Sequence, residues 1–206
     1  MSAGSNEKEF WDWFAANNHK FLFINEVDDG EREKFLDEIL DQLHEYCTEL
    51  YFEIGGHPDI VKVDFIITAE GFVEYFEYVE KLAAAAPDFE NWNIIAFKPP
   101  MGNGFMTIYE DEEYDPNKTV FLPLDNDDDP TAVGLKVCFA DYEKSSHGKY
   151  LTIAYIMLDT LIGEKSASLD VDYLDVIRTP ENLEDYTYDY LPEVVNFIRS
   201  KKSIID

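Results

Sequence analysis

YLTIAYIMLDTLIGEKSASLDVDYLDVIR, which runs from Tyr150 to Arg178, is the stretch that decides the fold. Its first part is almost entirely apolar, and many of its apolar residues recur at helical spacing. A helix that is apolar on nearly all sides is typical of a buried helix, and about 13 residues are too few to span a bilayer. We therefore predict a central helix over Tyr150–Ile162 that is buried on most of its circumference. The residues at helical spacing are Leu151, Ala154, Tyr155, Leu158, Leu161 and Ile162.

The residues after this helix predict its end and a strand. Gly163 suits the left-handed backbone that often follows a helix, and Leu169–Arg178 alternates as a strand does. Glu164 follows a helix that we expect to be buried. Its carboxylate is therefore either a hydrogen-bonded or solvated acid beside the cap, or a perturbed carboxylate that lines a pocket.

Patterns in the rest of the chain predict further helices and strands, with a turn at Gly55–Pro58. The expected helices are Glu7–Asn17, one that opens at Asp28–Gly30 and closes at Cys47, one from Glu70 through Ala86, and a short one over Glu193–Lys201. The expected strands are Leu50–Ile54, Ile60–Thr68, Trp92–Phe97, Phe105–Tyr109, Thr119–Leu124 and Val133–Ala140. We expect Glu110–Lys118 to be an acidic, turn-rich segment.

The order strand, strand, helix, strand occurs twice, between Leu50 and Phe97 and again between Thr119 and Arg178. A strand–helix–strand step favours parallel pairing with a right-handed crossover, and the hairpin before it adds antiparallel pairing. We expect an α+β fold, with a mixed, mostly antiparallel sheet and helices packed on one face, built as two strand–strand–helix–strand units. We expect residues 1–206 to form a single domain. Its parts are N-terminal helices in 1–48, the two halves in 49–100 and 118–178, and a C-terminal extension in 179–206.

Composition and charge restrict the possible partners. The chain has 206 residues with 44 acidic and 16 basic side chains, a net charge of −28, so its field repels nucleic acid and anionic lipid and attracts basic proteins. Its hydrophobic fraction of 46% is too high for a disordered chain. The partner we expect is a basic protein, with no nucleic acid and no membrane. The oligomeric state stays open.

Cysteine usage and the lack of export features favour the cytoplasm. Cys47 and Cys138 fall on predicted regular elements, so we expect both to be free and mostly buried. No basic segment followed by an apolar one opens the chain, and no apolar run is long enough to cross a bilayer.

The usual catalytic and metal-binding motifs do not occur, and we predict no catalytic, cofactor-binding or metal-ligating residues. Asp125–Asp129 resembles the start of a calcium loop. The resemblance ends where Pro130 stands in place of the required glycine and Lys136 in place of the bidentate glutamate. A solvated turn fits this run better, with loose cation binding as the alternative.

Aromatic residues give the first helix two interpretations. Phe10, Trp13 and Phe14 share one helical face, with Trp11 beside it. This face either docks on the core or forms a site for an aromatic ligand or a peptide. Trp11, Trp13 and Trp92, together with Glu164, are therefore the candidate interaction or pocket residues.

Three short motifs resemble those of a family of uncharacterised bacterial proteins. They are Phe10-Trp11-Asp12-Trp13-Phe14, then Ala86-Pro87 with Trp92-Asn93-Ile94-Ile95-Ala96-Phe97-Lys98-Pro99, and Leu158-Asp159 with Ile162-Gly163-Glu164. Ile162 stands where the family usually has leucine. The resemblance implies a fold and no known activity or catalytic residues. At the level of fold, the chain is also similar to acidic regulators of ribonucleases.

Two functions from different classes fit these observations. The first is a non-enzymatic protein-interaction or regulatory module, which the charge and the aromatic N-terminus favour. The alternative is an enzyme of unrecognised type with a carboxylate-lined pocket around Glu164. A pocket that holds Glu164 with a histidine or a second acid favours the enzyme, and an acidic face beside exposed Trp11 or Trp13 favours the module.

Overall fold

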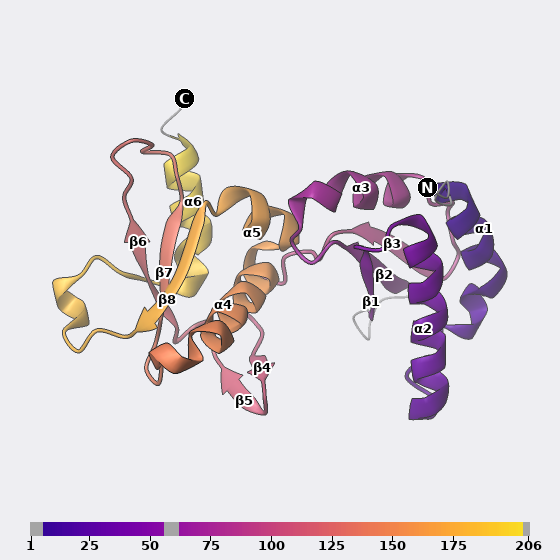
Figure 1. The fold of residues 1–206 in the computed structure, drawn as a ribbon, viewed down its shortest axis with the longest axis horizontal. Coiled ribbons are helices and arrows are strands. Elements are labelled where there is room, and N and C mark those ends of the chain that lie inside the picture. Colours follow the sequence, from indigo (N-terminus) through magenta and orange to yellow (C-terminus); the bar gives the residue numbers. More distant parts are fainter. Residues whose placement is uncertain (1–5, 56–61, 204–206) are drawn as a thin grey trace. The chain divides into compact units, whose positions relative to one another are not determined.

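A computed structural model describes residues 6–55 and 62–203. The chain divides into two compact units, unit 1 (Met1–Lys98) and unit 2 (Pro99–Asp206), and each has its own hydrophobic core (Figure 1). The two expected halves fall into different units. That both units form a single domain stays a prediction.

Unit 1 contains a three-stranded sheet in the order β1-β2-β3. β1 and β2 pair antiparallel, whereas β2 and β3 pair parallel because α3 crosses between them. The elements are α1 (Glu7–Asn17), α2 (Asp29–Tyr46), β1 (Tyr51–Gly55), β2 (Val63–Thr68), α3 (Phe76–Ala84) and β3 (Trp92–Ala96), with 3-10 turns at Asn18–Lys20 and Val73–Tyr75.

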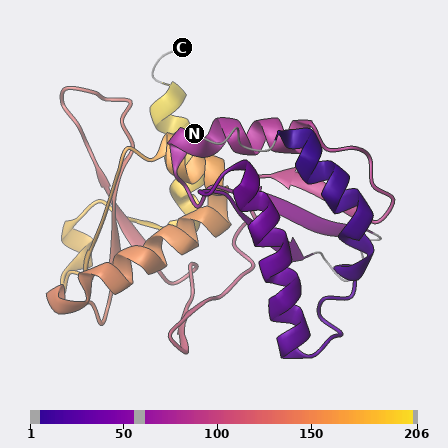
Figure 2. The same ribbon diagram turned by 45° about the vertical axis from the view of Figure 1, so that its right-hand side comes forward.

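Local sequence explains where the first helices of unit 1 begin. The Asn6 side chain accepts a hydrogen bond from the Glu9 backbone N–H at the start of α1, and Asp28 does the same for Glu31 at the start of α2. Along β2, Phe65 and Ile67 point to one face and join the core that the helices form. Figure 2 shows α1 and α2 side by side over the strands of this sheet.

Unit 2 contains a four-stranded sheet in the order β8-β7-β6-β9 and a separate two-stranded hairpin, β4-β5. Only the β7–β8 pair of the larger sheet is parallel. The elements are β4 (Thr107–Tyr109), β5 (Glu112–Tyr114), β6 (Val120–Leu124), β7 (Gly134–Phe139), α4 (His147–Ile162), α5 (Glu164–Asp170), β8 (Tyr173–Arg178), β9 (Asp189–Tyr190) and α6 (Val194–Lys202), with 3-10 turns at Lys144–Ser146, Leu183–Asp185 and Leu191–Glu193.

The core of unit 2 lies between one face of this sheet and two helices. Phe121, Val137 and Val176 come from three neighbouring strands and pack in one cluster with side chains of α4 and α6. The predicted α+β class is therefore confirmed, with mixed sheets in which antiparallel pairs predominate. The two strand–strand–helix–strand units are also confirmed, as β1-β2-α3-β3 and β6-β7-α4-β8.

α4 is buried or half-buried on most of its circumference over Tyr150–Ile162, as predicted, and its exposed side carries Tyr155 and Ile156, which are 51% and 39% exposed. Two details differ from the sequence predictions. Leu169 belongs to the short helix α5 rather than to the strand, which begins at Tyr173. Glu112–Tyr114, in the segment expected to consist of turns, forms β5.

Other features agree with expectation within the described residues. Gly163 has a φ of 81°, the positive value that favours glycine after a helix. Both cysteines are free, with Cys138 buried and Cys47 half-buried. Apart from Gly55, the expected turn at Gly55–Pro58 lies outside the described residues, as do Ile60 and Val61 of the expected second strand.

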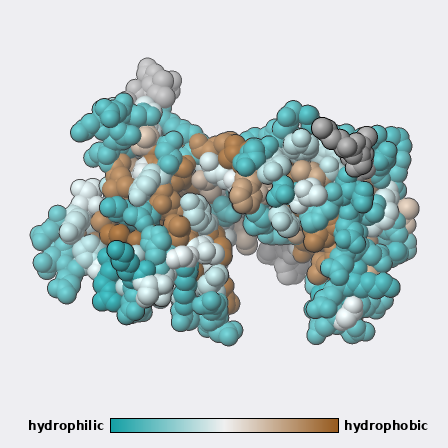
Figure 3. Space-filling view, in the orientation of Figure 1, coloured by the Kyte–Doolittle hydropathy of each residue, from teal (hydrophilic) through white to brown (hydrophobic). Residues whose placement is uncertain are grey.

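The face of the molecule shown in Figure 3 is hydrophilic over most of its area, as the charge of the chain suggests. Over residues 6–55 and 62–203, every helix is too short or too polar to cross a membrane.

Candidate functional site

The three candidate tryptophans lie in or against the core of unit 1. Trp11 and Trp92 are buried, and the Trp11 indole N–H donates a hydrogen bond to the Leu82 carbonyl oxygen at 2.8 Å. Trp13 is half-buried and packs on Phe21 at a ring-centroid distance of 5.9 Å. The structure therefore brings these residues together as packing groups. As contact residues for a partner, they stay predictions.

Glu164, the fourth candidate, is the first residue of α5 and has no exposed surface. A pocket of about 680 Å³ lies nearby in unit 2, against α4, α5 and α6, and its walls include Leu161, Ile162 and Ser166 but not Glu164. The carboxylate-lined pocket around Glu164, which the enzyme alternative requires, stays a prediction, because Glu164 does not line this pocket.

Four carboxylates of unit 2 line a larger pocket of about 1010 Å³. We call it the strand-end pocket, because Phe139, which ends β7, and Thr179, which follows β8, form part of its wall, together with residues of the β4-β5 hairpin and of the segment before β9. The carboxyl ends of parallel strands are a common place for ligands in sheets with helical crossovers. Its acidic residues are Glu112, Glu113, Asp115 and Asp141, and its tyrosines are Tyr114, Tyr150 and Tyr190.

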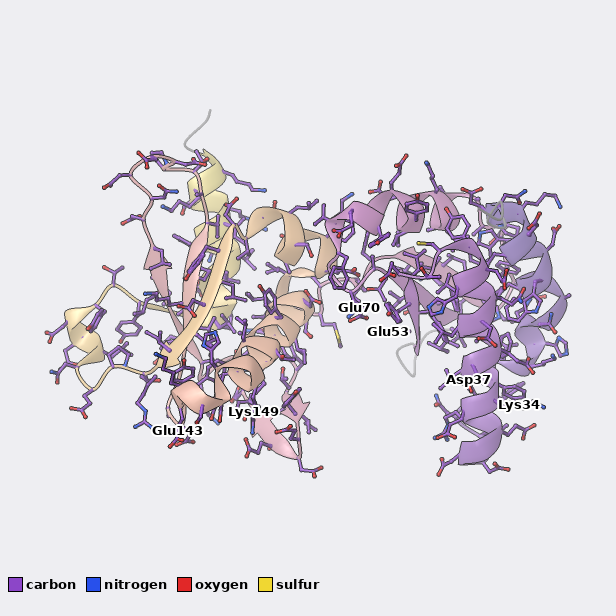
Figure 4. All side chains as sticks on the ribbon, viewed as in Figure 1. Lys34, Asp37, Glu53, Glu70, Glu143 and Lys149 are labelled. Carbon is purple, nitrogen blue, oxygen red and sulfur yellow. The ribbon has the colours of Figure 1, made fainter. Side chains whose placement is uncertain are left out.

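Two of these four carboxylates are neutralised by lysines. Lys149 Nζ lies 2.8 Å from Glu112 Oε2, and Lys118 Nζ lies 3.1 Å from Asp115 Oδ2. These contacts hold the pKa of Glu112 and that of Asp115 below their usual values. Figure 4 labels Lys149 on α4.

The other two carboxylates, of Glu113 and Asp141, have no ion-pair partner among residues 6–55 and 62–203. With two acids paired and two left over, the strand-end pocket carries an excess of negative charge. A cationic group in the pocket would compensate this charge. Because Glu113 and Asp141 are exposed to solvent, the attraction should be sensitive to salt.

Tyrosines shape the pocket and anchor its loops. The Tyr114 hydroxyl donates to Glu112 Oε2 at 2.5 Å, and the Tyr150 hydroxyl donates to the Asp141 carbonyl oxygen at 3.0 Å. Burial and the neighbouring Glu112 raise the pKa of Tyr114 to about 12, so its hydroxyl stays a neutral donor at pH 7. The second hydrogen bond fixes the backbone that carries the unpaired Asp141. Aromatic faces beside carboxylates suit a cation.

Cys138 in the pocket wall is not an activated nucleophile. Burial raises the pKa of the Cys138 thiol to about 11, so this cysteine of the pocket wall is protonated at pH 7. The thiolate is the reactive form of cysteine. The arrangement is therefore suited to binding rather than to covalent chemistry through Cys138.

A group with catalytic residue types lies near the start of α4. A hydrogen bond of 3.0 Å joins Tyr142 Oη and His147 Nδ1, and His147 Nε2 lies 3.9 Å from Asp175 Oδ1. A phenol, an imidazole and a carboxylate in series can pass a proton. The sequence did not suggest this group, because the three residues come from a loop, a helix start and a strand.

Across the described part of the chain, no group of three or more histidine, cysteine, aspartate or glutamate side chains is placed to hold a metal ion. In the acidic run at 125–129, the Asn126 side chain accepts from the backbone N–H of Asp128, and Asp129 accepts from that of Thr131. These are the hydrogen bonds of a turn.

Comparisons with known proteins add no family or homologue, since no family model, curated protein or solved structure matches this chain. The resemblance to a bacterial family stays a prediction. The strand-end pocket was missed by sequence reasoning because its residues are spread from Met106 to Tyr190. The acidic run at 110–113 was its one visible sign in the sequence, and a solvated turn explained that run better.

Proposed function

We propose that this protein is a non-enzymatic interaction module that binds a basic segment of a partner protein in the strand-end pocket of unit 2. The observation that carries the proposal is the pair of carboxylates, Glu113 and Asp141, that line a tyrosine-walled pocket without a lysine or arginine partner among the described residues. The net charge of −28 supports it, because the field of the whole chain attracts a basic surface.

The pocket supports a peptide better than a flat charged surface would. Aromatic walls provide apolar contact area, and carboxylates at the rim select charge and orientation. Glu112 and Asp115 are held by their lysines, so they frame the pocket while Glu113 and Asp141 stay available to a ligand. A cytoplasmic location and an absence of nucleic-acid binding belong to the same proposal and stay predictions.

Peptide titration of the full chain tests the proposal. A fluorescent nine-residue peptide with several lysines and arginines should bind, and a peptide of equal length with acidic residues should not. Affinity should fall steeply between about 0.1 M salt, where the Debye length is about 10 Å, and about 1 M, where it is about 3 Å. Duplex DNA and RNA should show no shift in a gel at low salt.

A matched pair of variants separates the pocket from the overall charge. Glu113→Gln with Asp141→Asn removes two charges from the pocket, and Glu33→Gln with Asp37→Asn removes two from the exposed side of α2 (Figure 4 labels Asp37). A lost charge-assisted hydrogen bond costs about 1.5–3 kcal/mol, and each 1.4 kcal/mol is tenfold in affinity, so we expect at least a roughly tenfold loss of affinity in the first variant. Equal effects of both variants would show that the pocket is not the site.

The second candidate function is an enzyme of unrecognised type. The observation that favours it is the series Tyr142, His147 and Asp175, because Glu164, on which the sequence placed this alternative, has no exposed surface. Substitution of His147 by alanine should leave peptide binding unchanged under our proposal. A hydrolytic activity toward a panel of esters and phosphoesters that His147→Ala abolishes would put the enzyme first.

A further inference from the structure

A second pocket of unit 2, the one of about 680 Å³ beside α4, α5 and α6, shares no residue with the strand-end pocket. We call it the helix-corner pocket, because its wall is formed by the end of α4, by one side of α5 and by residues from 195 to 203 of α6 and just after it. A volume of this size is typical of sites that enclose a small molecule. The character of its wall therefore indicates which molecule it suits.

The floor of the helix-corner pocket is apolar. Leu161 at the end of α4 and Ile198 in α6 are 4% and 6% exposed and belong to the core of unit 2. Ile162 and Val195 are half-buried and also line the pocket. The core thus reaches the surface at this place. An apolar group that enters the pocket is removed from water against aliphatic side chains, which is favourable.

The spacing along α6 sets charged groups beside this apolar floor. Four pocket residues of the helix stand at positions i, i+3, i+4 and i+7, the spacing of one helical face. They are Val195, Ile198, Arg199 and Lys202. The first two are apolar and the last two are cationic. One face of the helix therefore supplies part of the apolar floor and two positive charges in its last turn.

One of these two charges is neutralised within the protein. Lys202 Nζ is paired with Asp170 Oδ1, and the Ser166 hydroxyl donates to Asp170 Oδ2 at 2.6 Å. Burial raises the pKa of Asp170, but the contacts with Lys202 and Ser166 outweigh it and hold that pKa below its usual value. Each oxygen of this carboxylate thus has a donor, and Asp170 stays ionised at pH 7 as the partner of Lys202.

The other charge has no such partner. Arg199 is exposed and forms no ion pair with any residue in 6–55 and 62–203. The wall holds two cationic groups against one carboxylate, so the helix-corner pocket has an excess of positive charge in a chain whose net charge is −28. A carboxylate beside Arg199 would compensate this excess, because the planar guanidinium can donate two parallel hydrogen bonds to it.

We propose that the helix-corner pocket binds a small apolar carboxylate, with the hydrocarbon part on the floor and the carboxylate on Arg199. This site goes beyond the proposed function, because it takes an anion, whereas the strand-end pocket takes a cation. The occupant is a free small molecule rather than a protein segment. The field of the chain repels an acidic protein surface, whereas a small molecule brings a single negative charge, which Arg199 compensates.

Both parts of the ligand are needed for binding. An exposed arginine attracts a hydrated carboxylate only weakly, because water and salt screen the pair. An apolar molecule without a charge gains the contact with the floor but leaves Arg199 without a counter-ion. A carboxylate that carries a hydrocarbon chain gains both contributions at once, which is why we assign this class of ligand to the pocket.

Octanoate, a straight-chain carboxylate, is the probe for this site. Isothermal titration calorimetry of the full chain should show one saturable site with a Kd below about 1 mM. Two matched probes each lack one part: 1-octanol has no charge, and acetate has almost no hydrocarbon. Each should bind at least about fivefold more weakly, the upper end for an exposed ion pair. A peptide that ends in leucine with a free carboxylate tests the protein source. Tighter binding of this peptide than of octanoate would overturn the assignment to a free small molecule.

Substitutions in the pocket wall test the role of each charge. Arg199→Gln should weaken octanoate binding about fivefold or more, because the lost pair can be bidentate, and it should leave binding of 1-octanol unchanged. Lys34→Gln, on the exposed side of α2 in unit 1 (Figure 4 labels Lys34), removes the same charge elsewhere and should have no effect. Asp170→Asn should strengthen octanoate binding about twofold to fivefold, because it releases Lys202 for the ligand. A damaged fold cannot explain such a gain.

The outcomes are independent of the proposed function. The inference fails if octanoate does not saturate the chain below about 1 mM, or if Arg199→Gln binds octanoate as well as the wild type does. Arg199 would then serve only the carboxyl end of α6, where a positive charge stabilises a helix. Binding of the basic peptide in the strand-end pocket should be the same with and without octanoate, so either site can be rejected without the other.

Discussion

The substitution Leu158→Ala in α4 tests the core of unit 2. Leu158 is 1% exposed and belongs to the cluster that joins α4 to the sheet. Removing a buried leucine side chain loses its transfer free energy and leaves a cavity, and the two effects together cost about 2–5 kcal/mol. Since the whole stability of a protein is about 5–15 kcal/mol, this is a large fraction.

The size of the thermal shift also reports how the units unfold. If unit 2 unfolds by itself, each kcal/mol lowers its Tm by roughly 4–8 °C, whereas a chain of this length that unfolds as a whole loses roughly 2–4 °C per kcal/mol. Differential scanning calorimetry of the wild type and Leu158→Ala distinguishes these cases, because separate unfolding gives two transitions of which only one moves.

Tyr155→Ala on the same helix is the control. Tyr155 is 51% exposed, so its removal should change stability by no more than about 0.5 kcal/mol. A melting temperature of Leu158→Ala within a degree of the wild type would refute our account of α4 as the central helix of unit 2. A large loss from Tyr155→Ala would show that the outer side of α4 is covered in solution.

Three further predictions concern the cysteines and the hairpin beside the pocket. Cys138 should react slowly with thiol reagents in the native protein, more slowly than the half-buried Cys47, and both should react fast after unfolding; a disulfide found by mass spectrometry without added oxidant would contradict this. Glu110 and Asp111 form the turn between β4 and β5 with φ of 50° and 65°, so Asp111→Gly should raise the free energy of unfolding by about 1 kcal/mol in denaturant titrations, and a loss would argue against a primed turn. The pKa of Glu112 is lowered in the folded protein by Lys149, so the stability that this carboxylate adds is present above its unfolded pKa and is lost as pH falls through the folded value. Wild type should therefore be more stable than Glu112→Gln at pH 7, and the difference should shrink as the pH falls below the unfolded pKa of the carboxyl group, as melting curves over that pH range would check.

Local patterns were sufficient for the long elements. The aromatic face of α1 and the Asn6 cap fix its start, and the same residues, Glu7–Asn17, were expected and found. β7 and β8 were recognisable because their apolar residues recur in short runs. Such features depend on neighbours in sequence, so they can be found without knowing the fold.

Short or weakly apolar elements were not recognisable. α5 consists of Glu164–Asp170, a run with small and polar residues that has no strong apolar period, and the glycine before it suggested a stop. β5 has the sequence Glu-Glu-Tyr, which a charged turn explains equally well. Both elements form because tertiary packing outweighs a weak local preference.

The sequence alone determined the class of the fold, the repeated order of strands and helices, and the negative field that favours a basic partner. Only the tertiary structure decided which acids meet in a pocket and which are neutralised. Glu112 and Lys149 are 37 positions apart, and Asp141 and Thr179 come from the ends of two different strands. Charge neutralisation acts through space at a few ångströms, so the ion pair of Glu112 with Lys149, and the lack of one at Asp141 among the described residues, become visible only in the folded chain.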